Sequence, residues 1–290
     1  MNEPLDALLC AAAKAGIECP DVELIRAGEN HLYRLGDGIV GRVARPGEAE
    51  SVARETAVAR WLNASGINAV RPVEVEQPIV VGERAVTFWE ELPPHYPGTT
   101  AQVAAVLKRL HALPVPEQLS HLHLRPFIRL EERITEVGSL SQTDRSWLLG
   151  HLEDLKSRWQ NLPAGMPECV VHGDAWPGNV VQADGIGITL LDLERCSVGP
   201  PEWDLASTAV RYTTFGAIGE HEYREFCVTY GADVARWPGY EILRDIREMR
   251  VTCYIIQRAN DDPAYLDEAR LRLSCLRGTH GPRPWAWTPA

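Results

Sequence analysis

The pattern of apolar residues changes at the segment PPHYPG, residues 93–98, and this change divides the chain into two unlike halves. Between residues 22 and 45 the sequence alternates and breaks at glycines, which predicts short antiparallel strands. Beyond residue 98 most apolar residues recur at helical spacing. We therefore expect an α+β chain with a small antiparallel sheet in residues 1–92 and a mainly helical region in residues 93–290.

The first half contains one predicted helix among its strands. In residues 48–64, EAESVARETAVARWLNA, apolar side chains recur at roughly helical spacing, and Gly66 ends the run as a C-terminal cap would. Two further strand-like runs follow, RPVEVEQPIVVG at 71–82 and RAVTFWEEL at 84–92. The first half is thus expected to be a sheet accompanied by one helix.

The second half is expected to be helical except around one motif. Helical spacing is found at residues 102–113, 143–162, 203–215, 241–259 and 263–276. The exception begins with CVVHGD at 169–174, which is typical of a short strand that enters a tight turn. It continues with NVVQADGIGITLLDLE at 179–194, which predicts a hairpin whose turn is ADGIG.

Composition argues against several classes of protein. The net charge of −11 disfavours nucleic-acid binding, because phosphate contacts need a basic surface. No apolar run approaches the roughly 20 residues of a membrane helix, and the start of the chain lacks the basic region of a secretory signal. The 7 cysteines show neither a CxxC pair nor the spacing of a zinc site. We expect a soluble cytoplasmic protein with reduced, mostly buried thiols.

Polar residues follow the strand ends of the exceptional segment. Asp174 and Asn179 lie in the turn after the first predicted strand, and Asp192 comes at the end of the second arm of the hairpin. Oxygen ligands at the open edges of a hairpin can converge on one point without burial of an unpaired charge. Such a constellation suits Mg²⁺ bound together with phosphates, because Mg²⁺ keeps several waters and takes only one or two carboxylates.

The segments HGDAWPGN and LLDLE closely resemble the catalytic loop and the metal-binding segment of the aminoglycoside phosphotransferase and choline kinase family. This family is the small-molecule branch of the protein-kinase-like fold. The resemblance implies a bilobal fold, with an N-lobe at residues 1–92 that has a small antiparallel sheet and a mainly helical C-lobe at residues 93–290. The same resemblance implies phosphoryl transfer from a nucleoside triphosphate.

Residue roles follow from the matching positions. Asp174, the Asp after His-Gly, would be the catalytic base, and the Asn five residues on, Asn179, would hold Mg²⁺. Asp192 would hold Mg²⁺ as well. His172 is expected to brace the loop by hydrogen bonding, and Asp204 matches a family Asp that usually supports the loop.

The first half contains the remaining parts of such a site in the expected order. The turn AGENHLYRL at 27–35, with Gly28 and Asn30, would cover the phosphates. Arg42 in the strand-like segment VGRVAR would be the phosphate-binding cation, as in choline kinases, where protein kinases have Lys. Glu55 on the predicted helix would hold that cation.

The segment TFWEEL at 87–92 falls where the family has its inter-lobe hinge, whose backbone would receive adenine. The candidate cofactor-binding residues here are Glu90, Glu91 and Leu92.

Departures from the protein-kinase pattern favour a small acceptor over a protein. Trp176 stands two residues after Asp174, where protein kinases commonly have Lys. No glycine of a DFG motif follows Asp192, and Asp204 comes only twelve residues later, which is too short an interval for a peptide-docking activation segment. We expect an ATP- or GTP-dependent kinase that phosphorylates a hydroxyl group of a small molecule.

Two other classes of function remain as alternatives. A nucleotide-binding pseudokinase or sensor would use the same residues without catalysis, although it would have no chemical need for Asp174, Asn179 and Asp192 together. A metal-dependent hydrolase built on His172 and Asp174 would need further His ligands that the spacing does not provide. The acceptor stays open between an aminoglycoside, another antibiotic, a sugar and a choline-like amine, and the oligomeric state is not predicted.

Overall fold

The computed structural model describes residues 3–28, 30–138 and 140–287, which form two compact units. The first unit comprises Met1–Gln102 and Pro177–Cys196, and the second comprises Val103–Trp176 and Ser197–Ala290. Each of these units is made of two separate stretches of the chain. The expected division into lobes at residues 1–92 and 93–290 stays a prediction.

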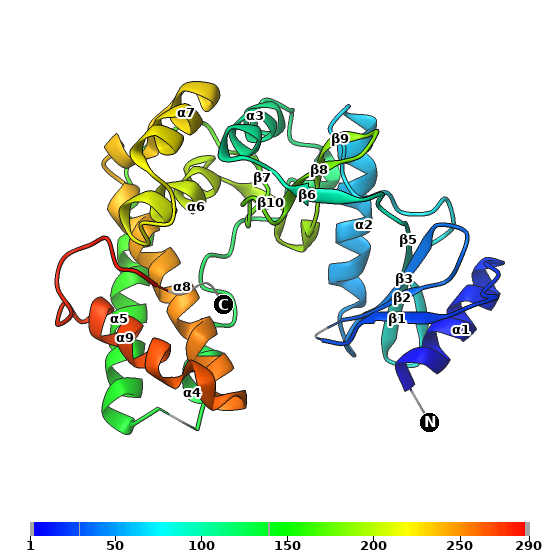
Figure 1. Cartoon of the computed structure of the whole chain (residues 1–290), viewed down its shortest axis with the longest axis horizontal. Coiled ribbons are helices and arrows are strands. Elements are labelled where there is room, and N and C mark those ends of the chain that lie inside the picture. Colours follow the sequence, from blue (N-terminus) through cyan, green and yellow to red (C-terminus); the bar gives the residue numbers. More distant parts are fainter. Residues whose placement is uncertain (1–2, 29, 139, 288–290) are drawn as a thin grey trace. The chain divides into compact units, whose positions relative to one another are not determined.

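The first unit is built on a five-stranded antiparallel sheet with strand order β1-β2-β3-β5-β4 (Figure 1). Its strands are β1 Glu23–Arg26, β2 His31–Arg34, β3 Ile39–Val43, β4 Ile79–Val81 and β5 Arg84–Glu90. The strands predicted at 22–45 are confirmed. The strand predicted from residue 71 begins only at Ile79, because Pro72 and Pro78 lack the N–H that a continuous ladder requires.

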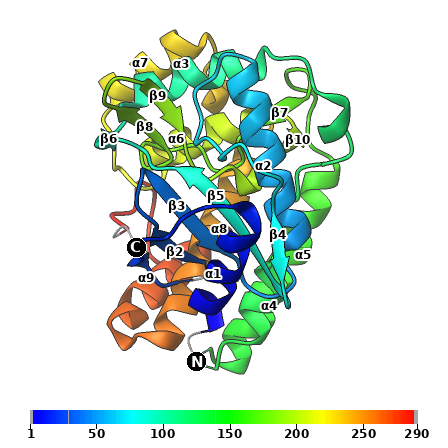
Figure 2. The ribbon, with the colours of Figure 1, turned by 90° about the vertical axis from the view of Figure 1, so that its right-hand side faces the viewer.

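Neighbouring residues of β3 face opposite sides of this sheet, and one helix lies on each side. Gly41 faces α1, Glu3–Ala15, where a Cβ at Gly41 would collide with Leu8 Cδ1. Figure 2 shows α1 lying across the strands. Arg42, the next residue, points to the opposite face and meets α2, Ala49–Ala64. The sequence pattern predicted α2 and its Gly66 terminus, where φ is +78°, but it did not predict α1.

The predicted hairpin forms within the first unit as strands β8, Val180–Ala183, and β9, Gly187–Leu190. A third strand, β6 His95–Pro97, pairs with β8, so the segment PPHYPG contains a strand. The hairpin is joined to the segment after α2, because Val70 N donates to Leu190 O at 3.0 Å and Leu190 N donates to Asn68 O at 2.9 Å. After β9 the chain continues into a short 3₁₀ turn, η2 Leu193–Arg195.

The second unit is mainly helical, as the sequence predicted. Its helices are α3 Thr100–His111, α4 Leu130–Thr135, α5 Gln142–Gln160, α6 Glu202–Thr213, α7 Glu220–Tyr230, α8 Tyr240–Asp261 and α9 Leu266–Leu276. Helix α8 is central, since it contacts α4, α5, α6 and α9 (Figure 1). Strands β7, Cys169–Val171, and β10, Ser197–Gly199, form an antiparallel pair. Helices α4 and α7 had no counterpart in the sequence-based expectation.

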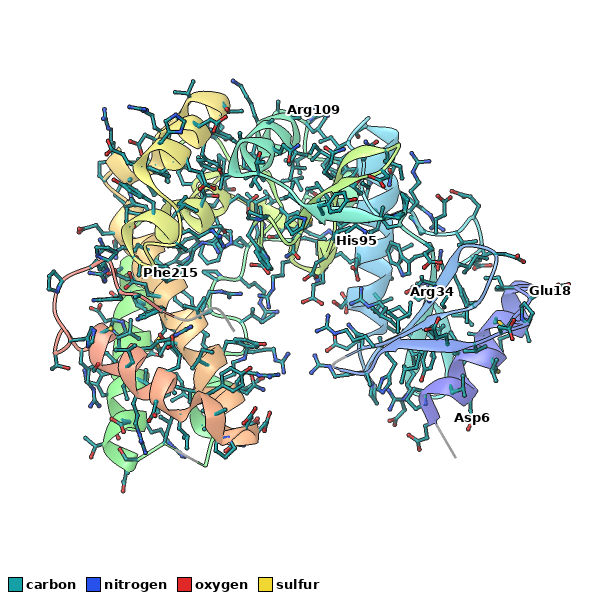
Figure 3. The ribbon with its side chains drawn as sticks, viewed as in Figure 1. Asp6, Glu18, Arg34, His95, Arg109 and Phe215 are labelled. Carbon is teal, nitrogen blue, oxygen red and sulfur yellow. The ribbon has the colours of Figure 1, made fainter. Side chains whose placement is uncertain are left out.

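The segment after α9 packs back onto this unit. Trp285 and Trp287 are buried with Cys275, and Phe215, labelled in Figure 3, stacks on Trp287. Arg283 forms two hydrogen bonds with the buried carboxylate of Glu248, at 2.7 and 2.6 Å. The Pro- and Trp-rich C-terminal sequence is therefore part of the folded unit through residue 287.

Cysteine and membrane predictions can be compared with these elements. All seven cysteines are free thiols, and Cys169, Cys196, Cys253 and Cys275 are buried, as expected. Within residues 3–28, 30–138 and 140–287, no helix has both the length and the apolar character needed to cross a membrane.

Candidate functional site

The loop that carries Asp174 is held by one buried carboxylate of the second unit. Asp204 Oδ2 accepts a hydrogen bond from His172 N at 2.7 Å, and Asp204 Oδ1 accepts one from Gly173 N at 2.8 Å. Gly173 has φ +85°, a conformation that glycine adopts without strain. The two bonds fix the backbone directly before Asp174, which is the supporting position predicted for Asp204.

Asp204 is completely buried and nevertheless keeps its charge. Burial raises the pKa of its carboxyl, but the hydrogen bond and charge of His111, with the charge and backbone N–H of His172, lower that pKa below its ordinary value. The His111 Nε2 to Asp204 Oδ2 distance is 3.1 Å, and His111 Nδ1 lies 2.9 Å from the Tyr230 hydroxyl. The sequence-based interpretation did not include His111, which belongs to α3 and has no recognisable motif around it.

The environment of His172 agrees with a supporting position. Its side chain is fully buried, and its Nδ1 accepts a hydrogen bond from Asp174 N at 3.4 Å. Trp203, at the start of α6, donates from its indole Nε1 to Gly173 O at 3.0 Å. The loop is thus held at three consecutive residues, while the Asp174 side chain itself is partly exposed.

Asn179 and Asp192 lie at the open end of the hairpin in the first unit. The register pairs Val180 with Leu190, and Leu191 N donates to Asn179 O at 2.8 Å, so the two arms stay together one residue beyond the ladder. Asp192 is exposed and has φ +53° and ψ +64°, in the left-handed region, where Asp is tolerated better than most residues.

This pair of side chains fits Mg²⁺ in its chemistry. Both provide oxygen ligands, and Asp192 accepts no capping hydrogen bond at the start of η2. Among residues 3–28, 30–138 and 140–287, no group of three or more His, Cys, Asp and Glu side chains could hold a metal ion by itself. Phosphate oxygens and waters would therefore complete the coordination, as is usual for Mg²⁺.

Arg42 is held from two elements of the first unit. Its Nη1 lies 2.5 Å from Glu55 Oε2, which confirms that β3 and α2 bring this predicted pair together. The Asn30 amide, oriented with its oxygen toward Arg42, accepts hydrogen bonds from Nη2 at 2.7 Å and from Nε at 3.2 Å. Arg42 is only 15% exposed and Glu55 only 3%, so this is not an ordinary surface pair.

Glu194 is an additional acid near Arg42 that the sequence-based interpretation left without a role. Its Oε2 lies 3.7 Å from Arg42 Nη2, and its carbonyl accepts a hydrogen bond from Arg54 Nη2 at 3.1 Å. The signal was available, because Glu194 is the last residue of the motif LLDLE. Burial raises the pKa of Glu55, and the nearby charges of Asp192 and Glu194 raise it further against the opposing effect of Arg42.

The predicted hinge residues differ in the hydrogen bonds that their backbone N–H groups form. Glu90 N donates to Arg71 O at 2.8 Å, and Glu91 N donates to Gly38 O at 2.6 Å. In the part of the chain that the structure describes, the Leu92 amide has no such partner. The backbone N–H groups of Glu90 and Glu91 are thus engaged within the first unit, and the adenine-binding role expected for residues 90–92 stays a prediction.

Gly28 shows no special conformation. It is exposed, it lacks a positive φ, and a Cβ there would meet atoms only at 3.7 Å or beyond. A phosphate-binding role for Gly28 consequently stays a prediction, and the adjacent Glu29 lies outside the described residues.

Residues 21–245 match the model of the phosphotransferase enzyme family. The chain belongs to this family. The matched segment contains both the loop of Asp174 and the pair of Arg42 and Glu55, so the resemblance inferred from the two motifs is confirmed. No curated protein sequence matches the chain.

Solved structures of similar fold align with nearly the whole of this chain. The amicoumacin kinase hAmiN in complex with AMP-PNP, Ca²⁺ and Ami is 16% identical, with a TM-score of 0.70 over 96% of this chain and 97% of that chain. The choline kinase LicA from Streptococcus pneumoniae is 14% identical, with a TM-score of 0.64 over 93% of this chain and 99% of that chain.

The spectinomycin phosphotransferase APH(9)-Ia, in complex with ADP and spectinomycin, is also 14% identical, with a TM-score of 0.63 over 96% of this chain and 94% of that chain. At these identities the similarity shows the fold alone. The α+β kinase-like fold class expected from the sequence is thus confirmed.

Proposed function

We propose that this family member transfers the γ-phosphate of ATP or GTP to a hydroxyl group of a small molecule. The observation that carries the proposal is the environment of Arg42, a nearly buried cation held by Glu55 at 2.5 Å and by the Asn30 amide at 2.7 Å. A guanidinium fixed from two sides is prepared for phosphate, because Glu55 and the Asn30 amide engage three of its five N–H groups and the other two can bind oxyanions with little loss of conformational freedom.

The nucleotide would be bound by residues of the first unit. The Leu92 N–H would receive the base, Gly28 and Asn30 would lie over the phosphates, and Arg42 would bind phosphate oxygens. Asn179 and Asp192 would hold Mg²⁺, which neutralises charge on the phosphates when it is bound.

Asp174 would orient the acceptor hydroxyl and accept its proton. The hydroxyl oxygen forms a bond to the γ-phosphorus while the bond from that phosphorus to the bridging oxygen breaks, and the nucleoside diphosphate leaves. Asp204 and His172 support this step only by holding the backbone before Asp174. General-base assistance is worth roughly 10²–10⁴-fold, and positioning supplies much of the remaining acceleration.

The alternative functions are supported less well. A pseudokinase or sensor would not need the intact set of Asp174, Asn179 and Asp192. A metal-dependent hydrolase would need His172 as a ligand, but that side chain is fully buried and braces the loop. The acceptor stays open between an antibiotic, a sugar and an amino alcohol, and a cytoplasmic location, where nucleoside triphosphates are abundant, belongs to the same proposal.

The test compares Asp174→Asn with Asp192→Ala. We expect Asp174→Asn to lower phosphoryl transfer by about 10²–10⁴-fold while Mg²⁺-nucleotide binding, measured by calorimetry, stays within about threefold. Asp192→Ala should instead weaken Mg²⁺-dependent nucleotide binding itself. Equal loss of binding and transfer in Asp174→Asn would make Asp174 a metal ligand, and nucleotide binding without turnover in the unmodified protein would favour the pseudokinase.

A further inference from the structure

Trp176 is an exposed aromatic residue on the loop of Asp174. The chain contains 9 tryptophans, all of which lie within residues 3–28, 30–138 and 140–287. Trp176 is 43% exposed, whereas every other tryptophan is buried or only partly exposed. Single exposed apolar residues are common on protein surfaces, so exposure alone does not make a binding residue. The position of Trp176 and its contacts decide the question.

A second tryptophan at the same loop shows what a structural tryptophan looks like here. Trp203 is 1% exposed, its indole N–H donates to Gly173 O at 3.0 Å, and the Arg247 guanidinium lies 4.4 Å from the centre of its ring. Trp176 differs on each of these points. Among the described residues its indole N–H has no hydrogen-bond partner, and neither an aromatic ring nor a guanidinium stacks on it. Its ring and its N–H are thus available to a ligand.

The backbone on both sides of Trp176 is fixed, so its exposure does not come from a loose loop. Before it, the Ala175 side chain is completely buried. After it, Pro177 restricts the backbone of both residues, and Pro177 O accepts a hydrogen bond from Gly98 N at 3.2 Å. The loop buries Ala175 and leaves the side chains on either side of it, Asp174 and Trp176, accessible.

Chain geometry keeps Trp176 close to the proposed catalytic base. Two residues of chain span at most about 7 Å, so the Cα atoms of Asp174 and Trp176 cannot lie farther apart. A hydroxyl group bound by Asp174 therefore belongs to a molecule whose neighbouring atoms are within reach of the indole. Both residues belong to the second unit, so this proximity does not depend on the placement of the first.

An accessible indole offers a ligand a flat and electrically distinct surface. The face of the ring carries the negative part of its quadrupole, so it attracts positively polarised C–H groups. A saturated ring, such as a pyranose or a cyclitol, presents C–H groups on one face and hydroxyl groups at its rim. When such a ring covers the indole, apolar area of both partners leaves water. An open-chain alcohol has no preformed face and loses more conformational entropy when it is flattened onto the indole.

We propose that Trp176 is a specificity-determining residue that stacks on the ring of a cyclic acceptor while Asp174 binds a hydroxyl at the rim of that ring. The inference rests on the proposed phosphotransferase function and deepens it, because it favours a sugar or cyclitol ring over an open-chain amino alcohol. Stacking needs no charge on the acceptor, so a neutral ring fulfils the requirement.

The first experiment compares acceptors that have similar polar groups and the same charge but differ in ring closure. ADP release from ATP is measured with myo-inositol against sorbitol, and with methyl β-glucosaminide against glucosaminitol. The cyclic member of at least one pair should have a kcat/KM about fivefold or more above that of its open-chain partner, as one aromatic stacking contact predicts. The neutral and the cationic pair together show which ring is preferred.

The second experiment changes the indole. Trp176→Ala should raise the KM of the preferred cyclic acceptor about tenfold and leave that of its open-chain partner within about twofold, whereas Trp176→Phe should keep part of the preference. The KM of ATP and the free energy of unfolding in urea should change little in both variants. The matched control is Val228→Ala in α7, because Val228 is an apolar residue of the same unit and is 75% exposed. This control should leave every acceptor KM unchanged.

A third measurement detects the contact without phosphoryl transfer. The difference between the emission spectra of the unmodified protein and Trp176→Phe isolates the signal of Trp176 from that of the other tryptophans. Without nucleotide, myo-inositol or methyl β-glucosaminide should shift this signal to shorter wavelength as the ring covers the indole, and the open-chain partners should not.

Four results would overturn the inference while leaving the phosphotransferase intact. These are equal use of cyclic and open-chain members, a cyclic preference that Trp176→Ala retains, a signal of Trp176 that no cyclic member changes, and a raised KM of ATP in Trp176→Ala with unchanged acceptor KM. The last result would place Trp176 on the nucleotide. Failure of the proposed function is distinguishable, because it would appear as absence of Mg²⁺-nucleotide binding or as a Trp176 signal that responds to rings without any phosphoryl transfer.

Discussion

Asp204 in the second unit and Glu55 in the first are both buried carboxylates that hold a residue of the candidate site, yet their pKa values move in opposite directions. Asp204 accepts hydrogen bonds from two consecutive backbone N–H groups and lies beside His111, and its pKa is lowered despite complete burial. Glu55 is bonded to one cation, Arg42, and burial together with the charges of Asp192 and Glu194 raises its pKa.

The difference shows which neighbouring groups stabilise the ionised form of a buried carboxylate. Backbone N–H groups are fixed by the fold and bring no competing acid, so Asp204 is stabilised as an anion wherever the loop is formed. Glu55 shares Arg42 with Glu194 and lies near Asp192, and these acids disfavour its ionised form. A bound phosphate and a metal ion would change the environment of Glu55 far more than that of Asp204. We therefore expect substitution of Asp204 to lower the free energy of unfolding and substitution of Glu55 to weaken nucleotide binding.

The largest expected effect is that of Asp204→Ala. The substitution leaves the N–H groups of His172 and Gly173 buried without their acceptor, which should cost about 3–5 kcal/mol of the free energy of unfolding. Urea denaturation measures this loss. Asp204→Asn keeps one acceptor oxygen and should lose less. If Asp204→Ala lost activity but kept its free energy of unfolding, the comparison would be contradicted, because Asp204 would then contribute to the reaction and not to stability.

Glu55→Gln should have the next largest effect and should act on the nucleotide. Loss of the charge partner of Arg42 in a buried pair costs about 2 kcal/mol or more, which is roughly a thirtyfold rise in the nucleotide KM, whereas an exposed pair would cost under about 1 kcal/mol. Steady-state kinetics at several ATP concentrations measures it. Arg42→Lys should keep part of the activity, since it restores charge but not the fork, and Arg42→Ala should be worse.

The double variant of Arg42→Ala with Glu55→Gln sharpens this result. If the two residues act as a unit, the double variant should be no worse than Arg42→Ala alone. Simple addition of the two effects would mean that Glu55 does not act through Arg42, and the phosphate-binding cation would then have to be sought elsewhere, with Arg45 the nearest candidate.

The smallest expected effect is a pH dependence that separates the two acids. Glu55 must be ionised to pair with Arg42, and its pKa is raised above the ordinary 4.5, so the nucleotide KM should rise severalfold as pH falls through the range just above 4.5. The same shift means that the folded protein binds this proton more tightly than the unfolded chain, so the Glu55 contribution to stability is present below pH 4.5 and is lost as pH rises through the raised pKa.

Asp204 has the opposite sign. Its lowered pKa gives stability that is present above the ordinary value of 3.8 and is lost as pH falls below that value. The nucleotide KM and the free energy of unfolding, measured across the acidic range, distinguish the two groups. Glu55→Gln should flatten the pH dependence of the KM without changing the acid unfolding below pH 3.8, and persistence of that dependence in the variant would assign it to another group.

Much of the local structure could be predicted because its signals lie within a few residues of one another. The hairpin of β8 and β9 follows from apolar arms around an ADGIG turn, and α2 follows from helical spacing that ends at Gly66. The prediction of a strand before Ile79 was wrong, because two prolines there lack the N–H that a continuous ladder requires. Helix α1 was missed, and the reason for its place appears only in the packing of Leu8 on Gly41.

By itself, the sequence determined the family, the order of the candidate site residues and the pairing of Arg42 with Glu55, because motifs keep residue types and spacing in the chain. Only the tertiary structure decided which side chains meet from distant segments: Asn30 and Glu194 at Arg42, and His111 at Asp204. The physical reason is that a contact between distant segments depends on how whole elements pack, and neither periodicity nor turn chemistry carries that information. The opposite pKa shifts of Glu55 and Asp204 arise from those contacts, so they too could not be predicted from the residue types alone.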